Sequence, residues 1–250
     1  MCGGKGMPQI VSFGQSDVGL YRSNNEDAFF VSTEFRLNVL ADGMGGAAAG
    51  EIASKIFTET AVEVFSGARA RSAEEDLKLI HKSYALANSR ILSHTEENPH
   101  HLGMGCTAEI LSFCDREFTL GHIGDSRIYL YRNAILTQLT RDHSYVQSQV
   151  EQGLMTPLEA RTHRLRNVIL RAVGTTEDLP ADLIRGSVSP GDLFLVCSDG
   201  LTDMVDDEDI EKALSLPSSI AAKVETLVDY AKGAGGRDNI TVILTEILEE

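Results

Sequence analysis

A short apolar run that ends in one carboxylate constrains this chain more than any other stretch. Residues Leu37–Ala41 are mostly apolar, Asp42 follows them, and residues 43–46 are rich in glycine. This order predicts a buried strand, a carboxylate at its end, and a turn into a helix of small residues from residue 47 to about residue 57. We therefore expect the strand to hold the Asp42 side chain at an opening in the fold.

Acidic residues recur beside apolar runs at four other places. They are Glu26 and Asp27 in RSNNEDAF, Asp125 in GDSR, Asp199 in CSDGL and Asp238 in GGRDNIT. We expect each to follow an apolar strand and to precede a turn, and any one alone is simply a turn or cap residue. If all converge, their charges raise one another's pKa values unless cations neutralise them. Oxygen ligands select hard ions, so the set predicts a site for Mg²⁺ or Mn²⁺.

Helix pairs follow runs of strands here, rather than one helix following each strand. Apolar spacing predicts helices over Gly50–Val64, residues 77–91, Asp206–Leu214 and Ser218–Lys232. It predicts strands over Gln9–Gln15, Ala28–Thr33, Leu37–Ala41, Thr107–Phe113, Glu117–Gly121, Ser126–Arg132, Ile135–Leu139, Leu183–Val188, Leu193–Cys197 and Ile240–Ile247. This order favours antiparallel sheets with helix pairs outside them over a doubly wound parallel sheet.

The charge balance restricts the partners of the protein. The chain carries 22 Lys and Arg residues against 37 Asp and Glu residues, a formal net charge of −15. Such a surface repels phosphate groups, so we expect neither nucleic acid nor an anionic membrane as a partner, and a phosphate-handling site would need local cations. No apolar run approaches the roughly 18 residues of a membrane span. A cytoplasmic monomer is the expected state, without signal peptide or coiled-coil pattern.

The motifs RSNNEDAF, ADGMGG, GDSR, CSDGL and GGRDNIT stand in this order between about Ser12 and Ile247. As an ordered set they resemble the protein phosphatase 2C or PPM family of metal-dependent serine/threonine phosphatases, and most closely its compact bacterial members. The resemblance implies an α+β fold, a four-layer α-β-β-α sandwich of two antiparallel sheets flanked by helix pairs. It also implies one domain over residues 1–250, with a flexible lead at 1–8 and a flap insertion at about 144–170.

The resemblance assigns roles to the acidic positions. Asp42 matches the carboxylate that bridges two metal ions, and Gly43 matches the residue that offers its backbone carbonyl to a metal. Asp199 and Asp238 match the ligands of one of these ions.

The remaining positions match further parts of the same site. Glu26 or Asp27 acts on the other ion, partly through water, and Asp125 with Asp199 matches the ligands of a third, weaker ion. Arg22 matches the arginine that grips the substrate phosphate, because a guanidinium can bond to two phosphate oxygens at once.

The implied reaction is hydrolysis of phosphoserine and phosphothreonine by direct attack of a hydroxide that bridges two Mn²⁺ or Mg²⁺ ions, without a covalent intermediate. The implied substrates are phosphorylated proteins, made by a partner serine/threonine kinase. Two alternatives stay open from the residues: a non-catalytic binding module that keeps the fold, and a hydrolase of small phosphorylated metabolites. The first would require loss of metal ligands, and none is lost here.

The flap carries a basic cluster on an acidic protein. Arg161, Arg164 and two neighbouring basic side chains form it, and Glu151 and Glu159 lie nearby in the sequence. A solvated helix face with balanced charge explains this pattern equally well. Our hypothesis is that Arg161 and Arg164 help to hold phosphopeptide substrates.

Overall fold

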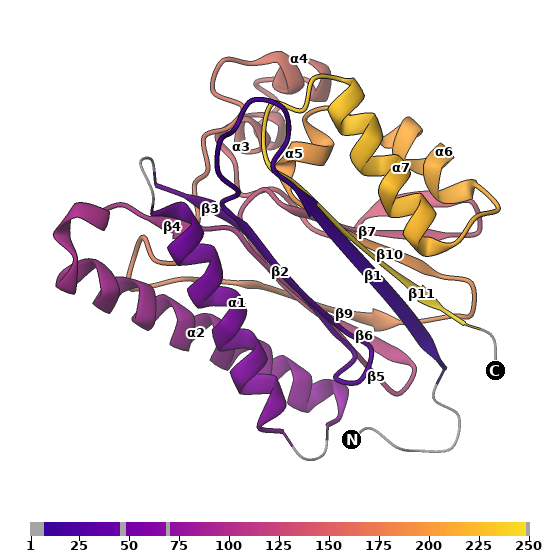
Figure 1. The fold of residues 1–250 in the computed structure, drawn as a ribbon, viewed down its shortest axis with the longest axis horizontal. Coiled ribbons are helices and arrows are strands. Elements are labelled where there is room, and N and C mark those ends of the chain that lie inside the picture. Colours follow the sequence, from indigo (N-terminus) through magenta and orange to yellow (C-terminus); the bar gives the residue numbers. More distant parts are fainter. Residues whose placement is uncertain (1–7, 46–48, 69–70, 249–250) are drawn as a thin grey trace.

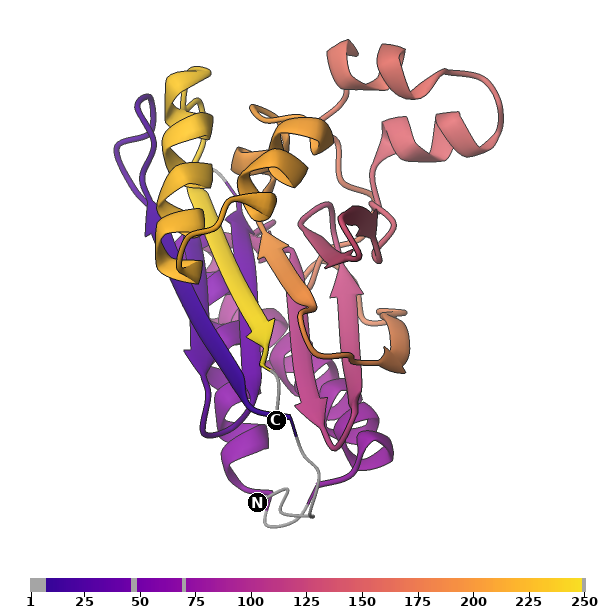
Figure 2. The ribbon, with the colours of Figure 1, turned by 90° about the vertical axis from the view of Figure 1, so that its right-hand side faces the viewer.

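The chain folds into two antiparallel β-sheets that pack face to face (Figures 1 and 2). The computed structural model describes residues 8–45, 49–68 and 71–248. The first sheet has the strand order β1 (Ile10–Asp17), β11 (Ile240–Ile247), β10 (Leu193–Cys197), β7 (Arg127–Arg132) and β8 (Ile135–Gln138). The second has the order β2 (Asp27–Ser32), β3 (Leu37–Met44), β5 (Ala108–Cys114), β6 (Glu117–Ile123) and β9 (Asp182–Ser187), and β4 (Gly105–Cys106) pairs with the end of β3.

Helix pairs cover the outer faces of both sheets. The second sheet is covered by α1 (Gly50–Ser66) and α2 (Ala73–Glu97), and the first by α6 (Asp207–Ser215) and α7 (Ile220–Gly233), as Figure 1 shows. The shorter helical segments are η1 (Pro99–His101), α3 (Tyr145–Glu151), α4 (Pro157–Thr162) and α5 (Asp199–Thr202). The predicted α+β sandwich of four layers is confirmed.

Alternation along the central strands explains why both faces of each sheet are apolar. On β10, Leu195 and Cys197 pack toward the helices, whereas Phe194 and Val196 point between the two sheets. Phe194 meets Phe113 of the other sheet edge-on, with ring centroids 5.2 Å apart. Because β10 buries both faces among apolar side chains, its sequence is continuously apolar.

The structure corrects the predicted position of Asp42. Strand β3 does not end before Asp42 but runs to Met44, so Asp42 and Gly43 lie inside the strand. The extension exists because Gly43 pairs with Cys106 of β4 and the Asp42 carbonyl accepts a hydrogen bond from the Thr107 N–H. These contacts come from far along the chain, so the local pattern could not predict them.

Other local expectations are also wrong. Asp27 and Asp238 do not follow apolar strands, because Asp27 opens β2 and Asp238 precedes β11. Asp199 stands in the first turn of α5, a short helix that periodicity did not predict. The predicted helix start at residue 47 lies outside the described residues, and α1 begins at Gly50. Of the predicted lead, Pro8 alone lies within the described residues.

The predicted flap interval, residues 144–170, lies between β8 and β9 and contains α3 and α4. Figure 2 shows both helices projecting from one end of the sandwich. Within the described ranges, no helix combines the length and apolar character needed to cross a membrane. That residues 1–250 form one domain stays a prediction.

Replacing Phe194 by alanine should lower the free energy of unfolding by about 3–5 kcal/mol, because the ring is fully buried between the sheets and its neighbours cannot close the gap. Urea unfolding in the presence of a chelator measures the change. The matched control is Ile135→Ala on edge strand β8, where the side chain is 63% exposed and the expected change is below about 0.5 kcal/mol. Equal losses in the two variants would contradict the inter-sheet core.

Candidate metal centre

Antiparallel pairing brings the predicted acidic side chains to one end of the sandwich. In such a sheet the end of one strand lies beside the start of its neighbour. Asp27 at the start of β2 is therefore the pairing partner of Asp42 near the end of β3. Asp199 follows β10 after Ser198, Asp238 precedes β11, and these two strands pair with each other. Asp125 lies in the connection from β6 to β7, which belong to different sheets.

Asp27 is held by two hydroxyl groups but keeps one unpartnered oxygen. Its Oδ2 accepts hydrogen bonds from Ser198 Oγ at 2.9 Å and from Thr241 Oγ1 at 2.6 Å. Its Oδ1 is buried without a hydrogen-bond partner. Burial raises the pKa of Asp27 to about 6, although both hydroxyls favour the ionised form. The carboxylate is thus anchored on one side and open to a cation on the other.

Three more carboxylates crowd the same end. Burial and then the neighbouring carboxylates raise the pKa values of Asp42 and Asp199 well above the ordinary value. Burial also raises the pKa of Asp125 to about 7, and the charges of Asp142 and Asp203 add to this effect. One oxygen of Asp125 and one of Asp199 are buried without a hydrogen-bond partner.

These unpartnered oxygens fit a metal ion. A buried acceptor without a donor is costly, and a buried charge without a counter-charge costs more. A hard divalent cation such as Mg²⁺ or Mn²⁺ would satisfy both needs with oxygen ligands alone. The fit rests on these oxygens and on the mutual repulsion, not on a formed coordination shell. Among the described side chains, no group of three or more Asp, Glu, His or Cys residues could hold a metal ion as it stands.

Gly43 occupies a position that only glycine can fill. A Cβ on Gly43 would lie 2.2 Å from the Gly50 carbonyl oxygen and 2.6 Å from the Glu26 carbonyl oxygen. The Gly43 N–H donates to that same Glu26 oxygen at 3.1 Å. Burial raises the pKa of Glu26, the Arg22 charge opposes this, and the Glu51 charge adds to it. Gly43 and Glu26 therefore belong to the same crowded end as the aspartates.

Arg22 lies at the edge of this cluster. Its Nη2 donates to Asp238 Oδ2 at 2.7 Å, and its side chain is 49% exposed. Because the guanidinium is held from one side only, it can reach outward to a phosphate as well. A planar fork with five N–H donors suits both partners at once.

A cavity of about 340 Å³ lies between these carboxylates and the flap. Asp125 and Asp199 line it from the sandwich, and Arg161 and Arg166 line it from the flap. Arg166 also pairs with Asp203 at 2.5 Å, so its charge is already balanced. The structure therefore brings Arg161 to the acidic end, and its contact with phosphopeptides stays a prediction. Arg164 is exposed and is not part of the cavity lining.

Several acidic residues of this end were not predicted from the sequence, and Asp142, Asp203 and Asp207 all line the cavity. Asp203 lines the cavity, and it follows Asp199 by four residues, a spacing that places both on one helix face. That spacing was the available signal. Glu51 in the first turn of α1 has a buried Oε2 without a partner, and its place just after the glycine-rich turn was the corresponding signal.

Comparison with known proteins gives relatives for this arrangement. The family model described as Protein phosphatase 2C matches residues 21–244. The serine/threonine protein phosphatase PstP of Mycobacterium tuberculosis is 38% identical over 235 residues, which cover 94% of this chain but 44% of that protein. The protein phosphatase PhpP of Streptococcus pneumoniae is 36% identical over 238 residues, which cover 94% of this chain and 96% of that protein. The chain thus spans less than half the length of one relative and nearly all of the other.

Solved structures agree with this fold. The crystal structure of Mycobacterium tuberculosis PstP/Ppp has a TM-score of 0.88 at 37% identity, covering 96% of this chain and 99% of that chain. The catalytic domain of PstP in complex with two manganese ions has the same TM-score and coverage at 36% identity. The serine/threonine phosphatase of S. agalactiae has a TM-score of 0.90 at 32% identity, covering 96% of this chain and all of that chain.

In chelator, Asp125→Asn should be more stable than the wild type at pH 7.5, and the difference should shrink toward pH 4. The folded-state pKa of Asp125 is raised to about 7 from 3.8, so the folded protein holds a proton that the unfolded chain releases. Stability from this group is therefore lost as pH rises from about 4 to about 7, by on the order of 1 kcal/mol or more. Thermal unfolding across this pH range measures the effect.

Saturating Mn²⁺ should reverse that order, because the ion binds the ionised carboxylate of the folded wild type and stabilises it by mass action. Asp229→Asn on the exposed face of α7 is the matched control and should follow the wild type throughout. A difference between Asp125→Asn and the wild type that stays constant with pH in chelator would contradict the burial of this charge.

Proposed function

The chain belongs to the protein phosphatase 2C family, and we propose that it is a metal-dependent protein serine/threonine phosphatase. It hydrolyses phosphoserine and phosphothreonine by direct attack of water on phosphorus, without a covalent intermediate. The observation that carries this proposal is the gathering of five aspartates at one end of the sandwich, beside an exposed arginine, with one unpartnered oxygen on each of Asp27, Asp125 and Asp199. The five aspartates are Asp27, Asp42, Asp125, Asp199 and Asp238, beside Arg22.

Two divalent ions, Mn²⁺ or Mg²⁺, are the proposed cofactors. In this proposal Asp42 would serve both ions, Asp199 and Asp238 would hold one of them, and Gly43 would offer its backbone carbonyl to a metal. Glu26 or Asp27 would act on the other ion, partly through water, and Asp125 with Asp199 would hold a third, weaker ion. When bound, such ions supply Lewis acidity that activates water and offsets the negative charge of the phosphoryl group. The two manganese ions of the related PstP catalytic domain support this set.

The residues of the chain supply binding and orientation. The pairing of β3 with β2, β4 and β5 fixes the backbone at Asp42, so its carboxylate cannot move away from its neighbours. Arg22 binds the phosphate through paired N–H groups, while Asp238 holds the guanidinium from behind. Charge that develops on the phosphoryl oxygens in the transition state is stabilised most strongly by donors that are already in place.

The proposed substrates are phosphorylated proteins made by a serine/threonine kinase. Since the formal net charge of −15 repels phosphate at long range, Arg22 and the flap arginines provide the local attraction. The same charge argues against nucleic acid and anionic membranes as partners. We place the protein in the cytoplasm as a monomer.

Asp42→Asn should lower the hydrolysis of both an aryl phosphate and a phosphothreonine peptide by at least about 10²-fold with Mn²⁺ present, because it removes the bridging charge. Steady-state kinetics of purified protein measure this, with Asp229→Asn as the matched control that retains activity. Activity of Asp42→Asn at the wild-type level would refute the proposal. Wild-type turnover of the aryl phosphate but of no phosphopeptide would favour a hydrolase of small metabolites, and no turnover despite Mn²⁺ binding would favour a binding module.

Arg161→Ala should lower kcat/KM for a phosphopeptide by about fivefold to tenfold at low salt, because it removes one charge-assisted contact from the cavity wall. Arg164→Ala should have the smaller effect, since Arg164 lies outside that wall. Added salt should narrow both differences. Arg185→Ala on β9, where Arg185 pairs with Glu117, is the matched control. Phosphopeptide turnover unaffected by Arg161→Ala at every salt concentration would exclude this arginine from substrate binding.

A further inference from the structure

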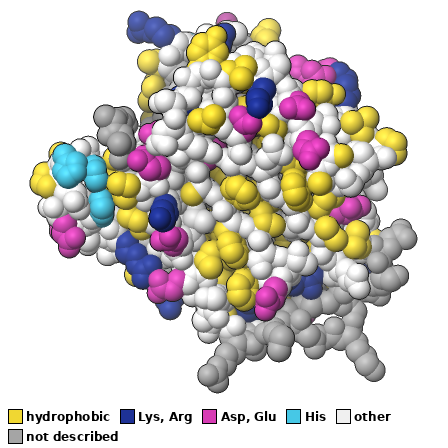
Figure 3. All heavy atoms as spheres, viewed as in Figure 1, with side chains coloured by type: hydrophobic (Ala, Val, Ile, Leu, Met, Phe, Trp, Pro, Cys, Tyr) yellow, Lys and Arg dark blue, Asp and Glu magenta, His cyan; other side chains and the backbone are white. Residues whose placement is uncertain are grey.

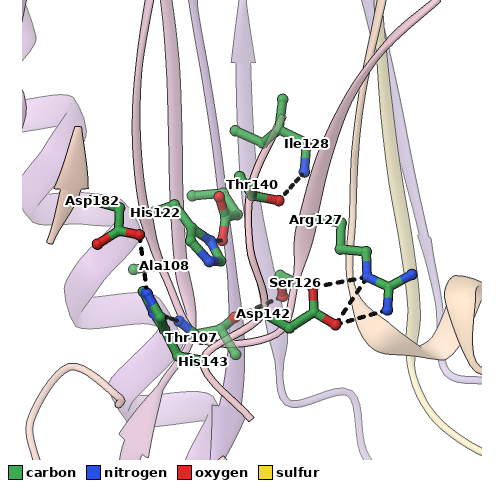
Figure 4. A network of polar contacts seen from close by, with 12 residues as sticks. Thr107, Ala108, His122, Ser126, Arg127, Ile128, Thr140, Asp142, His143 and Asp182 are labelled. Atoms are coloured by element: carbon green, nitrogen blue, oxygen red, sulfur yellow. Dashed lines mark hydrogen bonds and ion pairs between the residues drawn. The ribbon is translucent and has the colours of Figure 1, made fainter. Parts of the chain in front are cut away.

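The residues just before the flap are attached to the turn that carries Asp125. Figure 4 shows this region, with Asp142 facing Arg127 and the His143 ring beside His122. The Arg127 guanidinium donates to both Asp142 oxygens at 2.7–3.1 Å. The backbone N–H of His143 donates to the Gly124 carbonyl at 2.6 Å. The backbone N–H of Gly124 donates back to the His143 ring at Nδ1, at 3.1 Å. His143 therefore makes a reciprocal pair with the residue that precedes Asp125.

The backbone of His143 also binds the C-terminal end of the flap. The Leu170 N–H donates to the His143 carbonyl at 2.7 Å, and the Tyr145 N–H donates to the Val168 carbonyl at 2.8 Å. Ser144 forms an antiparallel bridge with Ile169. The chain thus leaves for the flap and returns from it at one place, and His143 joins that place to the Gly124 turn.

The environment of the ring fixes its orientation. The His143 side chain is buried and stacks on His122, with ring centroids 4.6 Å apart. His122 is itself held by Glu109 at 2.6 Å inside the sandwich. Because the Gly124 N–H points at Nδ1, we assign the proton of the neutral ring to Nε2, which lies 3.3 Å from Asp182 Oδ2 and 3.1 Å from Arg171 Nη1. Burial, followed by the charges of His122 and Arg171, lowers the pKa of His143 to about 4, in keeping with a neutral ring.

We propose that His143 is a positioning residue that sets the place of the flap relative to the Gly124–Asp125 turn. It thereby sets the width of the cavity between the flap and the carboxylates, and so selects for phosphoprotein substrates that fill this cavity. This inference rests on the proposed phosphatase function. Nδ1 of His143 acts as a hydrogen-bond acceptor and the stacked ring acts as a spacer, and neither contacts substrate.

Two variants separate the acceptor from the ring. His143→Phe keeps an aromatic ring against His122 but removes the acceptor for the Gly124 N–H. His143→Asn loses the ring but places an amide oxygen where Nδ1 stood, so it is the conservative rescue. If the Nδ1 acceptor sets the position of the flap, His143→Phe should lose amide protection and substrate preference. His143→Asn should keep most of both.

The first measurement uses the protein in chelator and needs no activity. Amide hydrogen exchange followed by NMR should show the Gly124 amide, and the amides of α3, exchanging about tenfold faster in His143→Phe than in wild type or His143→Asn. Unchanged exchange in α3 would overturn the proposal, because the flap would then be positioned without His143.

The second measurement compares substrates in the presence of Mn²⁺. His143→Phe should lower kcat/KM for a phosphothreonine peptide about tenfold more than for an aryl phosphate, which is too small to span the cavity. Equal losses on both substrates, or no rescue by His143→Asn, would show a merely structural role. If the wild type turns over neither substrate, the proposed function fails, while the exchange measurement still decides the positioning role.

A further variant guards against misfolding of the buried substitutions. Asp182 is 41% exposed, so Asp182→Ala should fold, and it removes the carboxylate that pairs with both His143 Nε2 and Arg171 Nη1. As in His143→Phe, but by a smaller factor, the amides of α3 should exchange faster than in the wild type. The loss of kcat/KM should again be larger for the phosphopeptide than for the aryl phosphate. Asp178→Ala, on the exposed segment before β9, is the matched control and should match the wild type. Identical behaviour of Asp182→Ala and Asp178→Ala in both measurements would count against the proposal.

Discussion

Mutual repulsion between buried carboxylates is the constraint on which this structure depends. Asp27, Asp42, Asp125 and Asp199 have raised pKa values because they are buried together at one end of the sandwich. Flexible loops would relieve this repulsion by moving apart. Asp27 and Asp42 lie in paired strands and cannot move apart without breaking ladder hydrogen bonds, and Asp125 and Asp199 lie in short segments next to β6, β7 and β10. The fold therefore holds unbalanced negative charge at one end of the sandwich, where a bound cation would relieve the repulsion.

Much of the fold follows from the sequence because its signals are local. Strand alternation and helix spacing are properties of neighbouring residues, and they predicted the four long helices and every strand except the two-residue β4. The errors arose where distant segments decide. Asp42 lies inside β3 because Cys106 and Thr107 extend that strand, and no pattern near Asp42 encodes this pairing. Asp27 and Asp238 precede their strands, yet antiparallel pairing still places them beside Asp42 and Asp199.

The site was predictable to a similar extent. In the sequence, Arg161 and Arg164 are equivalent members of a basic cluster. In the fold, Arg161 lines the cavity and Arg164 does not. Asp203 was overlooked because its role depends on α5, a helix too short for periodicity to reveal. The link from His143 to Gly124 spans 19 residues and uses a side chain whose motif gives no hint of a partner.

Both ends of the flap meet at His143. The flap segment that lines the cavity is therefore separate along the chain from the carboxylates of the sandwich. A loop whose ends are already joined adds little entropic cost when it lengthens, about 0.6 kcal/mol for each doubling. Residues 144–170 can therefore vary in length and sequence while the carboxylate end keeps its geometry. Such modularity would let one catalytic scaffold acquire new preferences among targets by exchange of a single surface segment, with the chemistry inherited unchanged.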